Sequence, residues 1–278
     1  MPELPELQAH AERLAAGFGG AELERFRPLA FTALKTVDPA PEAALGSPIT
    51  RVTRLGKYLL VEVGPLTFVV HLMQGGRLVP DEKQSAKPRG GLARWTFTDG
   101  RALLLTEQSK ERRAGVWVVA GDPATQAPIL GIGPDAATLT LEELRVALDG
   151  PSVRVHGFLR DQRRVAGLGR RLANEICHRA RLSPFAPTGK LAGDDVSALH
   201  DAIESCLADA LTVERARDTM SSSAERPGAV YHRTGEACPA CGDTIRAVEY
   251  TSYTVNYCPT CQTKGKVLAD NTTSKFVK

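Results

Sequence analysis

Four cysteines near the C-terminus constrain the fold more than any other feature of this chain. They form two C-x-x-C pairs, with sixteen residues between Cys241 and Cys258. Two pairs at this separation are typical of a tetrahedral zinc site, in which each pair holds one side of the ion. The alternative is two extracellular disulfides, but the chain begins with prolines and acidic residues rather than a secretion signal. The spacing predicts one structural Zn²⁺ bound by Cys238, Cys241, Cys258 and Cys261, with no position left for metal catalysis.

The rest of the chain has the composition of an ordinary globular protein. Its 278 residues are 42% hydrophobic and 24% charged, which is close to the averages for soluble domains. This length is sufficient for two or three units with their own cores. No apolar run approaches the roughly 20 residues that a membrane-spanning helix requires. We therefore expect a cytoplasmic protein that has no membrane partner.

Hydrophobic periodicity predicts a β-rich first half. Residues 1–16 have the pattern of an amphipathic helix, which the glycines from Gly17 onward are expected to stop. The dipeptide Asp99-Gly100 between two apolar runs is a strong hairpin signal. Short β-like runs at this spacing indicate a sandwich or barrel-like domain. The predicted runs are Ile49–Val63, Thr67–Met73, Ala93–Thr98, Ala102–Thr106 and Val116–Ala120.

After a Pro-, Gly- and Ala-rich linker, the period becomes helical. Thr140 and Glu143 have the spacing of a capping box, and Gly150-Pro151 ends that helix. Further helices are predicted over Ser152–Asp161, Gly169–Ala180 and Asp194–Leu211. The expected fold class is therefore α+β and multi-domain. It comprises a β-sandwich-like domain with a leading helix (1–122), a linker (123–138), a helical domain (139–224) and a hairpin with the four cysteines (225–278).

The distribution of charge is more informative than the net charge of +3. Between residues 154 and 190, nine lysines and arginines stand against only two acidic residues. Such a segment suits a surface that binds a polyanion such as nucleic acid. A solvated basic helix without a ligand is the alternative, and charge alone does not exclude it.

The N-terminus carries a chemical signal of its own. If Met1 is removed, Pro2 presents a secondary amine, and an α-amine has a pKa of about 7.7–8.0, so part of it is unprotonated at neutral pH. Such an amine can attack C1′ of a sugar and form an iminium intermediate. Glu3 beside it can carry protons as a general acid or base. The alternative is structural, because Pro followed by Glu at a helix N-terminus also complements the helix dipole.

Several segments together resemble one family. They occur in that family's order over essentially the whole chain, and we identify the chain as similar to the bacterial formamidopyrimidine-DNA glycosylase and endonuclease VIII proteins. The segments are Pro2-Glu3-Leu4-Pro5-Glu6, Gly56-Lys57-Tyr58-Leu59-Leu60, His71-Leu72, Asp161-Gln162, Val165-Ala166-Gly167-Leu168-Gly169, Val230-Tyr231 and the four-cysteine finger.

The resemblance implies bifunctional base-excision repair of double-stranded damaged DNA, by a bacterial monomer that associates with the nucleoid when bound to DNA. Such an enzyme extrudes a damaged base, cleaves its glycosidic bond and nicks the strand by β- or β/δ-elimination. By position, Pro2 is the nucleophile and Glu3 the proton carrier. Lys57 and His71 correspond to phosphate-contacting positions. Gly169 lies in the expected helix–two-turn–helix, where a glycine lets the backbone approach a phosphate.

Four positions depart from the family pattern. Arg170-Arg171 stand where an asparagine usually contacts phosphate, and Tyr253 stands where the finger usually carries an arginine. Gln74 occupies the usual place of a methionine that fills the gap left by base flipping, although Met73 precedes it. Arg113 is retained as a candidate to probe the orphaned base, but Ala114 replaces an aromatic side chain that would stack on bases.

These departures leave alternatives to a glycosylase/AP lyase for oxidised bases. One is a DNA-binding paralogue that recognises abasic or distorted sites with little excision activity. Another is a lyase specialised for bulky or alkylated lesions, for which the shortened side chain makes room. The presence of Pro2, Glu3 and Lys57 favours an enzyme.

Overall fold

The computed structural model describes residues 1–109 and 111–268, which divide into two compact units. The first unit comprises residues 1–131 and 217–222, and the second comprises residues 132–216 with 223 to the C-terminus. Among the described residues, no helix is long and apolar enough to span a membrane.

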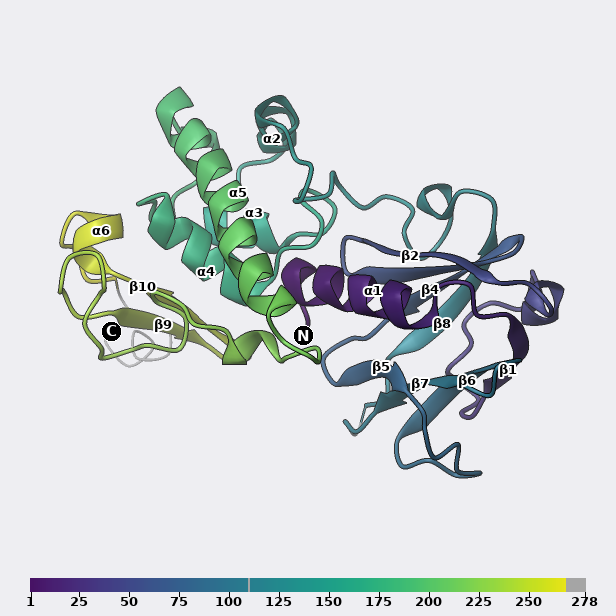
Figure 1. Ribbon diagram of the computed structural model, residues 1–278. Coiled ribbons are helices and arrows are strands. Elements are labelled where there is room, and N and C mark those ends of the chain that lie inside the picture. Colours follow the sequence, from purple (N-terminus) through teal and green to yellow (C-terminus); the bar gives the residue numbers. More distant parts are fainter. Residues whose placement is uncertain (110, 269–278) are drawn as a thin grey trace. The chain divides into compact units, whose positions relative to one another are not determined.

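The first unit is a β-sandwich with a leading helix, as predicted (Figure 1). Helix α1 (Leu4–Phe18) packs on β2 and buries Leu7, Ala11 and Leu14 on one face. One antiparallel sheet has the order β1-β6-β7-β5 and the other β2-β3-β4-β8. The strands are β1 (Leu23–Pro28), β2 (Ile49–Leu55), β3 (Tyr58–Val63), β4 (Leu66–His71), β5 (Gly76–Pro80), β6 (Gly91–Phe97), β7 (Ala102–Glu107) and β8 (Gly115–Ala120).

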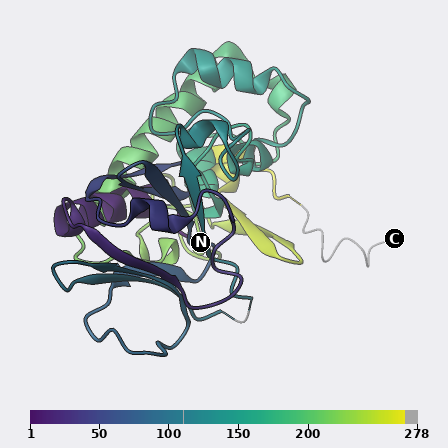
Figure 2. The same cartoon turned by 90° about the vertical axis from the view of Figure 1, so that its right-hand side faces the viewer.

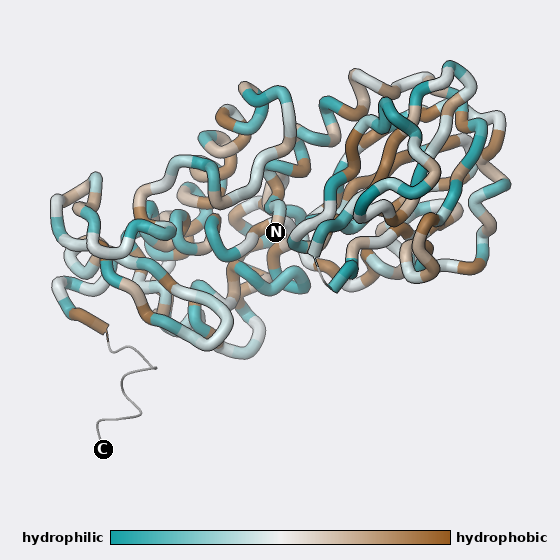
Figure 3. The backbone as a smooth tube through the Cα atoms, turned by 90° about the horizontal axis from the view of Figure 1, so that it is seen from below, coloured by the Kyte–Doolittle hydropathy of each residue, from teal (hydrophilic) through white to brown (hydrophobic). Residues whose placement is uncertain are grey.

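The core of this unit lies between the two sheets and under α1. Its largest fully buried side chains include Trp95, Phe68 and Phe97, and the rings of Phe68 and Trp95 meet edge to face at 5.8 Å. Figure 3 shows the hydrophobic stretches along the strands of this sandwich. The predicted hairpin at Asp99-Gly100 joins β6 to β7, with Gly100 at a positive φ of 82°.

The structure adds two strands to the prediction and divides one predicted run into two strands. The run predicted over 49–63 is two strands, β2 and β3, because Gly56 adopts a positive φ of 55° and turns the chain at Gly56-Lys57. Strand β1 was not predicted because only Leu23 and Phe26 of its six residues are buried. Strand β5 escaped prediction because it is short and bounded by Gly76 and Pro80.

The second unit holds the helices and the four-cysteine hairpin. Thr140 caps α2 (Leu141–Leu148) by accepting the Glu143 N–H at 3.2 Å, as its capping-box spacing predicts. The helical packing is dominated by α4 against α5. The β9–β10 hairpin extends from this unit as a two-stranded ribbon (Figure 2). The remaining elements are α3 (Val155–Arg160), α4 (Arg170–Arg179), α5 (Gly193–Arg215), β9 (Arg246–Tyr250), β10 (Tyr253–Tyr257) and α6 (Pro259–Thr263).

Candidate active site and nucleic-acid interface

A small pocket at the N-terminus brings together four of the predicted site residues. Pro2, Lys57, His71 and Met73 all line it. The sheet register explains why, because Tyr58 pairs with His71 and so places the β2–β3 turn beside the end of β4. Segments that lie far apart in the sequence thus surround the residue that would become the first residue once Met1 is removed.

Burial and nearby charges set the basicity of the amino terminus. Burial lowers the pKa of the Met1 amino group below its usual value, and the positive charge of Lys57 lowers it further. Glu3 and Glu6 act in the opposite direction. Both carboxyl groups belong to buried residues, and the Glu3 backbone N–H donates to Glu6 Oε2 at 2.7 Å. The environment therefore favours a neutral amine, which is the nucleophilic form.

His71 is held as a neutral imidazole in this pocket. Burial and the neighbouring Lys57 lower its pKa to about 4. The Met73 backbone N–H donates to His71 Nδ1 at 3.1 Å, which requires that this nitrogen carries no proton. The proton of the neutral ring is consequently on Nε2, and this N–H is the group that His71 can offer to a phosphate oxygen.

Two histidines of the first unit, His10 and His71, have lowered pKa values, and we therefore expect the protein to lose stability in mild acid. His10, whose Nε2–H donates to the Leu78 carbonyl at 2.7 Å, also has its pKa lowered to about 4, mainly by burial. Between this value and the ordinary 6.5, the unfolded chain binds more protons than the folded chain, so stability falls as the pH decreases. We expect His10 to contribute about 3 kcal/mol of this loss once the pH reaches 4.

The measurement is urea unfolding at pH 7, 5.5 and 4.5, with His10→Gln and His71→Gln as variants. Each variant should show a flatter pH dependence than the wild type, because the carboxylates that also destabilise proteins in acid are unchanged. A pKa near 6.5 for either histidine by NMR would contradict the prediction.

The loops expected to fill the gap left by a flipped base are polar where they are exposed. Met73 has a positive φ of 50° and is half-buried, whereas Gln74 is exposed. Arg113 is exposed, and its Nε lies 3.1 Å from Glu111 Oε2. Ala114 is fully buried, and its N–H donates to Glu107 Oε2 at 2.7 Å. The position that usually carries an aromatic side chain therefore contributes to the core instead.

In the second unit, the turn before α4 is built on a glutamine. Gln162 Oε1 accepts the Gly167 N–H at 3.0 Å, and its Nε2 donates to the Leu168 carbonyl at 2.8 Å. Gly167 has φ +100°, a conformation that favours glycine. Gly169 is the N-cap of α4, and Arg170 follows as its first residue with an exposed side chain. This turn thus places a cation, Arg170, at the N-terminus of α4, where the helix dipole favours an anion such as a phosphate.

Tyr253 lies at the centre of an arginine cluster. The Arg160 guanidinium lies over its ring at 4.4 Å from the centroid, and the Arg170 guanidinium at 5.5 Å. The Tyr250 ring stacks on Tyr253 at 4.6 Å, and the Tyr250 hydroxyl accepts a hydrogen bond from Arg154 at 2.9 Å. Cation–π contacts of this kind hold guanidinium groups in place without neutralising them. Sequence analysis did not single out Arg160 as a contact, because its partner is 93 positions away in the chain.

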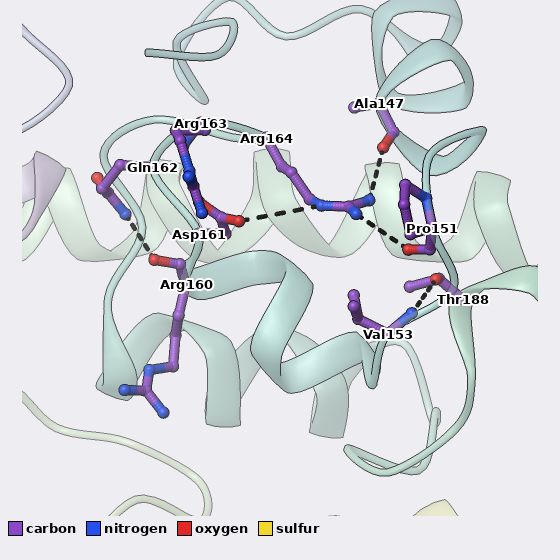
Figure 4. Close-up of polar contacts among 9 residues, drawn as sticks. All are labelled: Ala147, Pro151, Val153, Arg160, Asp161, Gln162, Arg163, Arg164 and Thr188. Carbon is purple, nitrogen blue, oxygen red and sulfur yellow. Dashed lines mark hydrogen bonds and ion pairs between the residues drawn. The ribbon is translucent and has the colours of Figure 1, made fainter. Parts of the chain in front are cut away.

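Three further arginines of the basic segment have structural partners. Arg164 donates to the carbonyls of Ala147 and Pro151, and Arg163 contacts Asp161 (Figure 4). The same view shows the Arg160 side chain pointing away from this group. Among the expected DNA contacts, Arg171 requires a correction. It is 3% exposed and donates to the Arg226 carbonyl, so its charge supports the interior and does not face a phosphate.

The four cysteines of the hairpin lie together, as their spacing predicts. Their four Sγ atoms are all within 4.8 Å of one another, with Cys238 and Cys261 at 3.9 Å and Cys241 and Cys258 at 3.4 Å. These separations exceed the roughly 2.05 Å of a disulfide. They are close to the ~3.8 Å edge of a tetrahedron with metal–sulfur bonds of about 2.3 Å. The donor set and its geometry thus fit a metal ion.

Buried polar residues that sequence analysis missed fasten this hairpin to α4. Asn174 Oδ1 accepts the Asn256 N–H at 2.6 Å, and the Asn174 side chain also donates to the Arg170 carbonyl at 2.6 Å. His178 Nε2 lies 3.2 Å from Cys238 Sγ. Glu175 accepts three backbone N–H groups, from Ala229, Val230 and Tyr231. The sequence shows these three polar residues within one predicted helix but does not indicate their partners.

Comparisons with known proteins agree with this arrangement. The model of the formamidopyrimidine-DNA glycosylase N-terminal domain matches residues 1–117, and that of the formamidopyrimidine-DNA glycosylase H2TH domain matches residues 130–222. The formamidopyrimidine-DNA glycosylase of Chloroflexus aurantiacus is 31% identical over 272 residues, which cover 94% of this chain and 98% of that protein. An uncharacterized formamidopyrimidine-DNA glycosylase-like protein of Mycobacterium tuberculosis is 40% identical over 162 residues, 58% of this chain and 100% of that protein.

Solved structures share the fold. A MutM structure in complex with DNA containing carbocyclic 8-oxo-G has a TM-score of 0.81 at 21% identity, and the match covers 94% of this chain and 100% of that chain. Wild-type Lactococcus lactis Fpg in complex with DNA containing N7-benzyl-Fapy-dG has a TM-score of 0.83 at 22% identity, with the same coverage. Because relatives at about 30% identity span nearly the full length and both domain models match, this chain belongs to the formamidopyrimidine-DNA glycosylase family.

Proposed function

We propose that this protein excises a damaged base from double-stranded DNA and nicks the strand, with Pro2 as nucleophile. As a member of its family, the chain is a DNA glycosylase of base excision repair with AP lyase activity. The assignment of individual residues rests on one observation above all. Pro2, Lys57 and His71 line the same small pocket, and burial there lowers the pKa of the Met1 amino group of the unprocessed chain, which supports the proposal.

The proposed chemistry begins once Met1 has been removed. The neutral Pro2 amine attacks C1′ as the bond from C1′ to the base breaks, and the departing base takes up a proton. The nitrogen then loses its proton as the C1′–O4′ bond breaks and O4′ takes up a proton, which opens the sugar ring and gives the iminium. The iminium makes the C2′ proton acidic, and removal of that proton expels the 3′ phosphate by β-elimination. Glu3 carries protons in these steps. Lys57 and the Nε2–H of His71 hold the neighbouring phosphate so that the sugar meets the amine.

Borohydride trapping on DNA with an abasic site tests this proposal. Borohydride reduces the iminium, so a protein that uses Pro2 as proposed becomes covalently attached to the DNA. Strand cleavage on the same substrate reports elimination. Specific binding without trapping or cleavage would instead support the paralogue that only recognises abasic or distorted sites.

In the second unit, we propose that Arg160 and Arg170 replace the family's usual phosphate contacts. Both guanidiniums lie over the Tyr253 ring, next to the N-terminus of α4. Their geometry is set by the ring rather than by an acidic partner, which leaves the charges available for a DNA phosphate. Tyr253 therefore acts as a support for the cations, at a position where the family usually has a cation itself.

Salt dependence of DNA binding measures this contribution. Arg160→Ala and Arg170→Ala should each weaken binding and reduce the slope of log K against log salt by about one, as expected for one lost phosphate contact. Arg163→Ala is the matched control, because its side chain is 82% exposed and contacts Asp161. The control should keep the wild-type slope. If the Arg160 and Arg170 variants also keep it, neither residue contacts a phosphate.

We further propose that the four-cysteine cluster holds one structural Zn²⁺. The chemistry of four thiolates in a tetrahedral arrangement suits zinc, and all four positions would be filled by sulfur, so the ion would stabilise the hairpin without reacting. The contact between His178 and Cys238 supports this assignment, because donors next to a metal-bound thiolate orient the ligand. In this scheme the ion fixes Tyr250 and Tyr253 by fixing the hairpin that carries them.

We propose that the damaged bases that the protein excises are oxidised or alkylated. Ala114 is buried and small, so it does not favour a particular oxidised purine. The room that it leaves supports bulky lesions as a second candidate, and Lactococcus lactis Fpg has been crystallised with DNA containing a bulky N7-benzyl-Fapy-dG. We propose that the protein acts as a monomer in the cytoplasm, bound to nucleoid DNA.

A further inference from the structure

One end of the β-sandwich gathers the loops of the N-terminal pocket. His71 pairs with Gly115, which places the end of β4 beside the start of β8. Gly76 pairs with Glu107, so the β4–β5 and β7–β8 loops leave the sheets at this same end. Strand β1 ends here as well, because its last residue, Pro28, pairs near the start of β6. The segment that follows β1 is therefore a neighbour of the site loops.

This neighbouring segment is firmly held by its backbone. The Leu29 N–H donates to the Leu92 carbonyl at 2.8 Å, and the Val116 N–H donates to the Ala33 carbonyl at 2.8 Å. The Lys35 N–H in turn donates to the Val116 carbonyl at 2.8 Å. The segment thus continues the sheet beyond β8, directly after the Arg113-Ala114 loop, and it has a defined position at the site end of the sandwich.

The side chain of Phe31, in the middle of this segment, is 100% exposed. Burying a phenylalanine stabilises a fold by about 1.5–3 kcal/mol, so a fully solvated ring on an anchored loop gives up that stabilisation. Phe31 is therefore not part of the hydrophobic core. An exposed ring at the site end is instead suited to meet a flat apolar partner.

Cationic side chains stand on the segments that adjoin Phe31, together with one exposed acidic residue, Glu111, which pairs with Arg113. Lys35 is exposed and packs its side chain on Gly115. Arg112 and Arg113 are exposed on the adjoining loop, where Arg112 donates to the Gly91 carbonyl at 2.7 Å. An aromatic ring among cations matches DNA, whose phosphates pair with the charges while its bases stack on the ring.

The described residues of the β7–β8 loop include no exposed aromatic side chain. Ala114 is fully buried, and a side chain on Gly76 would collide with it at 2.9 Å. The exposed side chains among the described residues of this loop are polar or charged, including Gln108, Glu111, Arg112 and Arg113. A protein that flips a nucleotide must still fill or brace the space in the stack.

We propose that Phe31 is the apolar side chain that inserts into the DNA stack when a nucleotide is extruded. This inference rests on the proposed function, in that a base-flipping enzyme leaves such a gap. It assigns to the segment after β1 a role that Ala114 is too small and too buried to perform. In this proposal Lys35 and Arg112 hold the flanking phosphates while the ring contacts the bases.

The test uses the full chain with a free N-terminus and a DNA duplex that carries a tetrahydrofuran abasic analogue next to 2-aminopurine. Insertion of the ring changes the stacking of 2-aminopurine and therefore its fluorescence. Phe31→Ala should bind this duplex about tenfold or more weakly and lose the fluorescence change, as expected for one lost base–aromatic contact. Phe31→Trp should keep both, with quenching of the new tryptophan on binding.

Val37→Ala is the matched control. Val37 is 94% exposed on the same connection, but it follows Thr36, whose hydroxyl accepts the Val118 N–H at 2.9 Å further along β8. This variant should behave as the wild type does. Equal affinity and equal fluorescence for Phe31→Ala and Val37→Ala would overturn the proposal. So would self-association of the wild-type chain that disappears in Phe31→Ala while the fluorescence change persists.

The outcome is separable from that of the proposed function. Binding to the abasic analogue needs no covalent step, so a wild-type chain that fails in borohydride trapping can still show the Phe31 effect. In that case the nucleophile assignment fails and the insertion role stands. If the Phe31→Ala variant is trapped normally and also retains the fluorescence change, the insertion role fails and the nucleophile assignment stands.

Discussion

A protein that keeps Met1, or carries an N-terminal tag, is expected to lose borohydride trapping on abasic DNA down to the background level. The reason is chemical, because an iminium forms from a free amine, and a retained Met1 or a tag moves that amine away from the Pro2 nitrogen, the position from which it is proposed to attack C1′. In a blocked chain, the Pro2 nitrogen is part of a peptide bond and has no basic lone pair. The change does not touch the core of the sandwich, so the fold should persist.

The matched control is the same chain with its tag at the C-terminus. Mass spectrometry should show that Met1 has been removed from this control, and trapping should proceed normally. Binding of both proteins to a tetrahydrofuran duplex separates loss of chemistry from loss of DNA binding. Trapping at the normal rate by the blocked protein would show that Pro2 is not the nucleophile. Lys57, which lines the same pocket, would then be the first candidate.

Replacement of Cys258 with Ser is expected to release the metal and unfold the hairpin. Short metal-bound segments lack the apolar area to fold alone, and structural zinc contributes about 10–16 kcal/mol in zinc-finger peptides. Tyr253 would then no longer support the guanidiniums of Arg160 and Arg170. Affinity for abasic DNA should fall at least about tenfold, which is about 1.4 kcal/mol.

Metal analysis, circular dichroism and a binding titration check this expectation. Cys206→Ala is the control, since Cys206 is a buried residue of α5 outside the four-cysteine cluster. It should retain the metal of the wild type. The urea transition of the β-sandwich should be the same in both variants. Purified wild-type protein without stoichiometric zinc would contradict the assignment, and so would a Cys258→Ser variant that keeps its metal.

The sequence alone determined the features that depend on near neighbours in the chain. The two C-x-x-C pairs predicted the cysteine cluster because the spacing within each pair fixes how close two thiols can lie. Thr140 and Glu143 predicted the start of α2 because a capping box is completed within one turn. Short apolar runs bounded by turn signals predicted most strands of the sandwich, since such runs favour buried strands.

Only the tertiary structure decided which residues meet across long separations. Arg170 and Arg171 are adjacent in the sequence, yet one is exposed and the other buried, because successive residues of a helix point about 100° apart and packing selects the inward one. The contact of Arg160 with Tyr253 joins residues 93 positions apart. No local pattern predicts such a contact.

Long-range packing likewise decided which residues meet in the N-terminal pocket. Pro2, Lys57 and His71 appear in the sequence as three separate residues, and the pairing of β3 with β4 brings the last two together beside α1. Ala114 differs from the usual aromatic residue, but only the packing shows that it is buried beneath Gly76. The exposed ring of Phe31 is likewise visible only once β1 and β8 are in place. Local patterns thus determined the kinds of chemistry that the chain carries, and long-range strand pairing and burial decided which side chains reach solvent and each other.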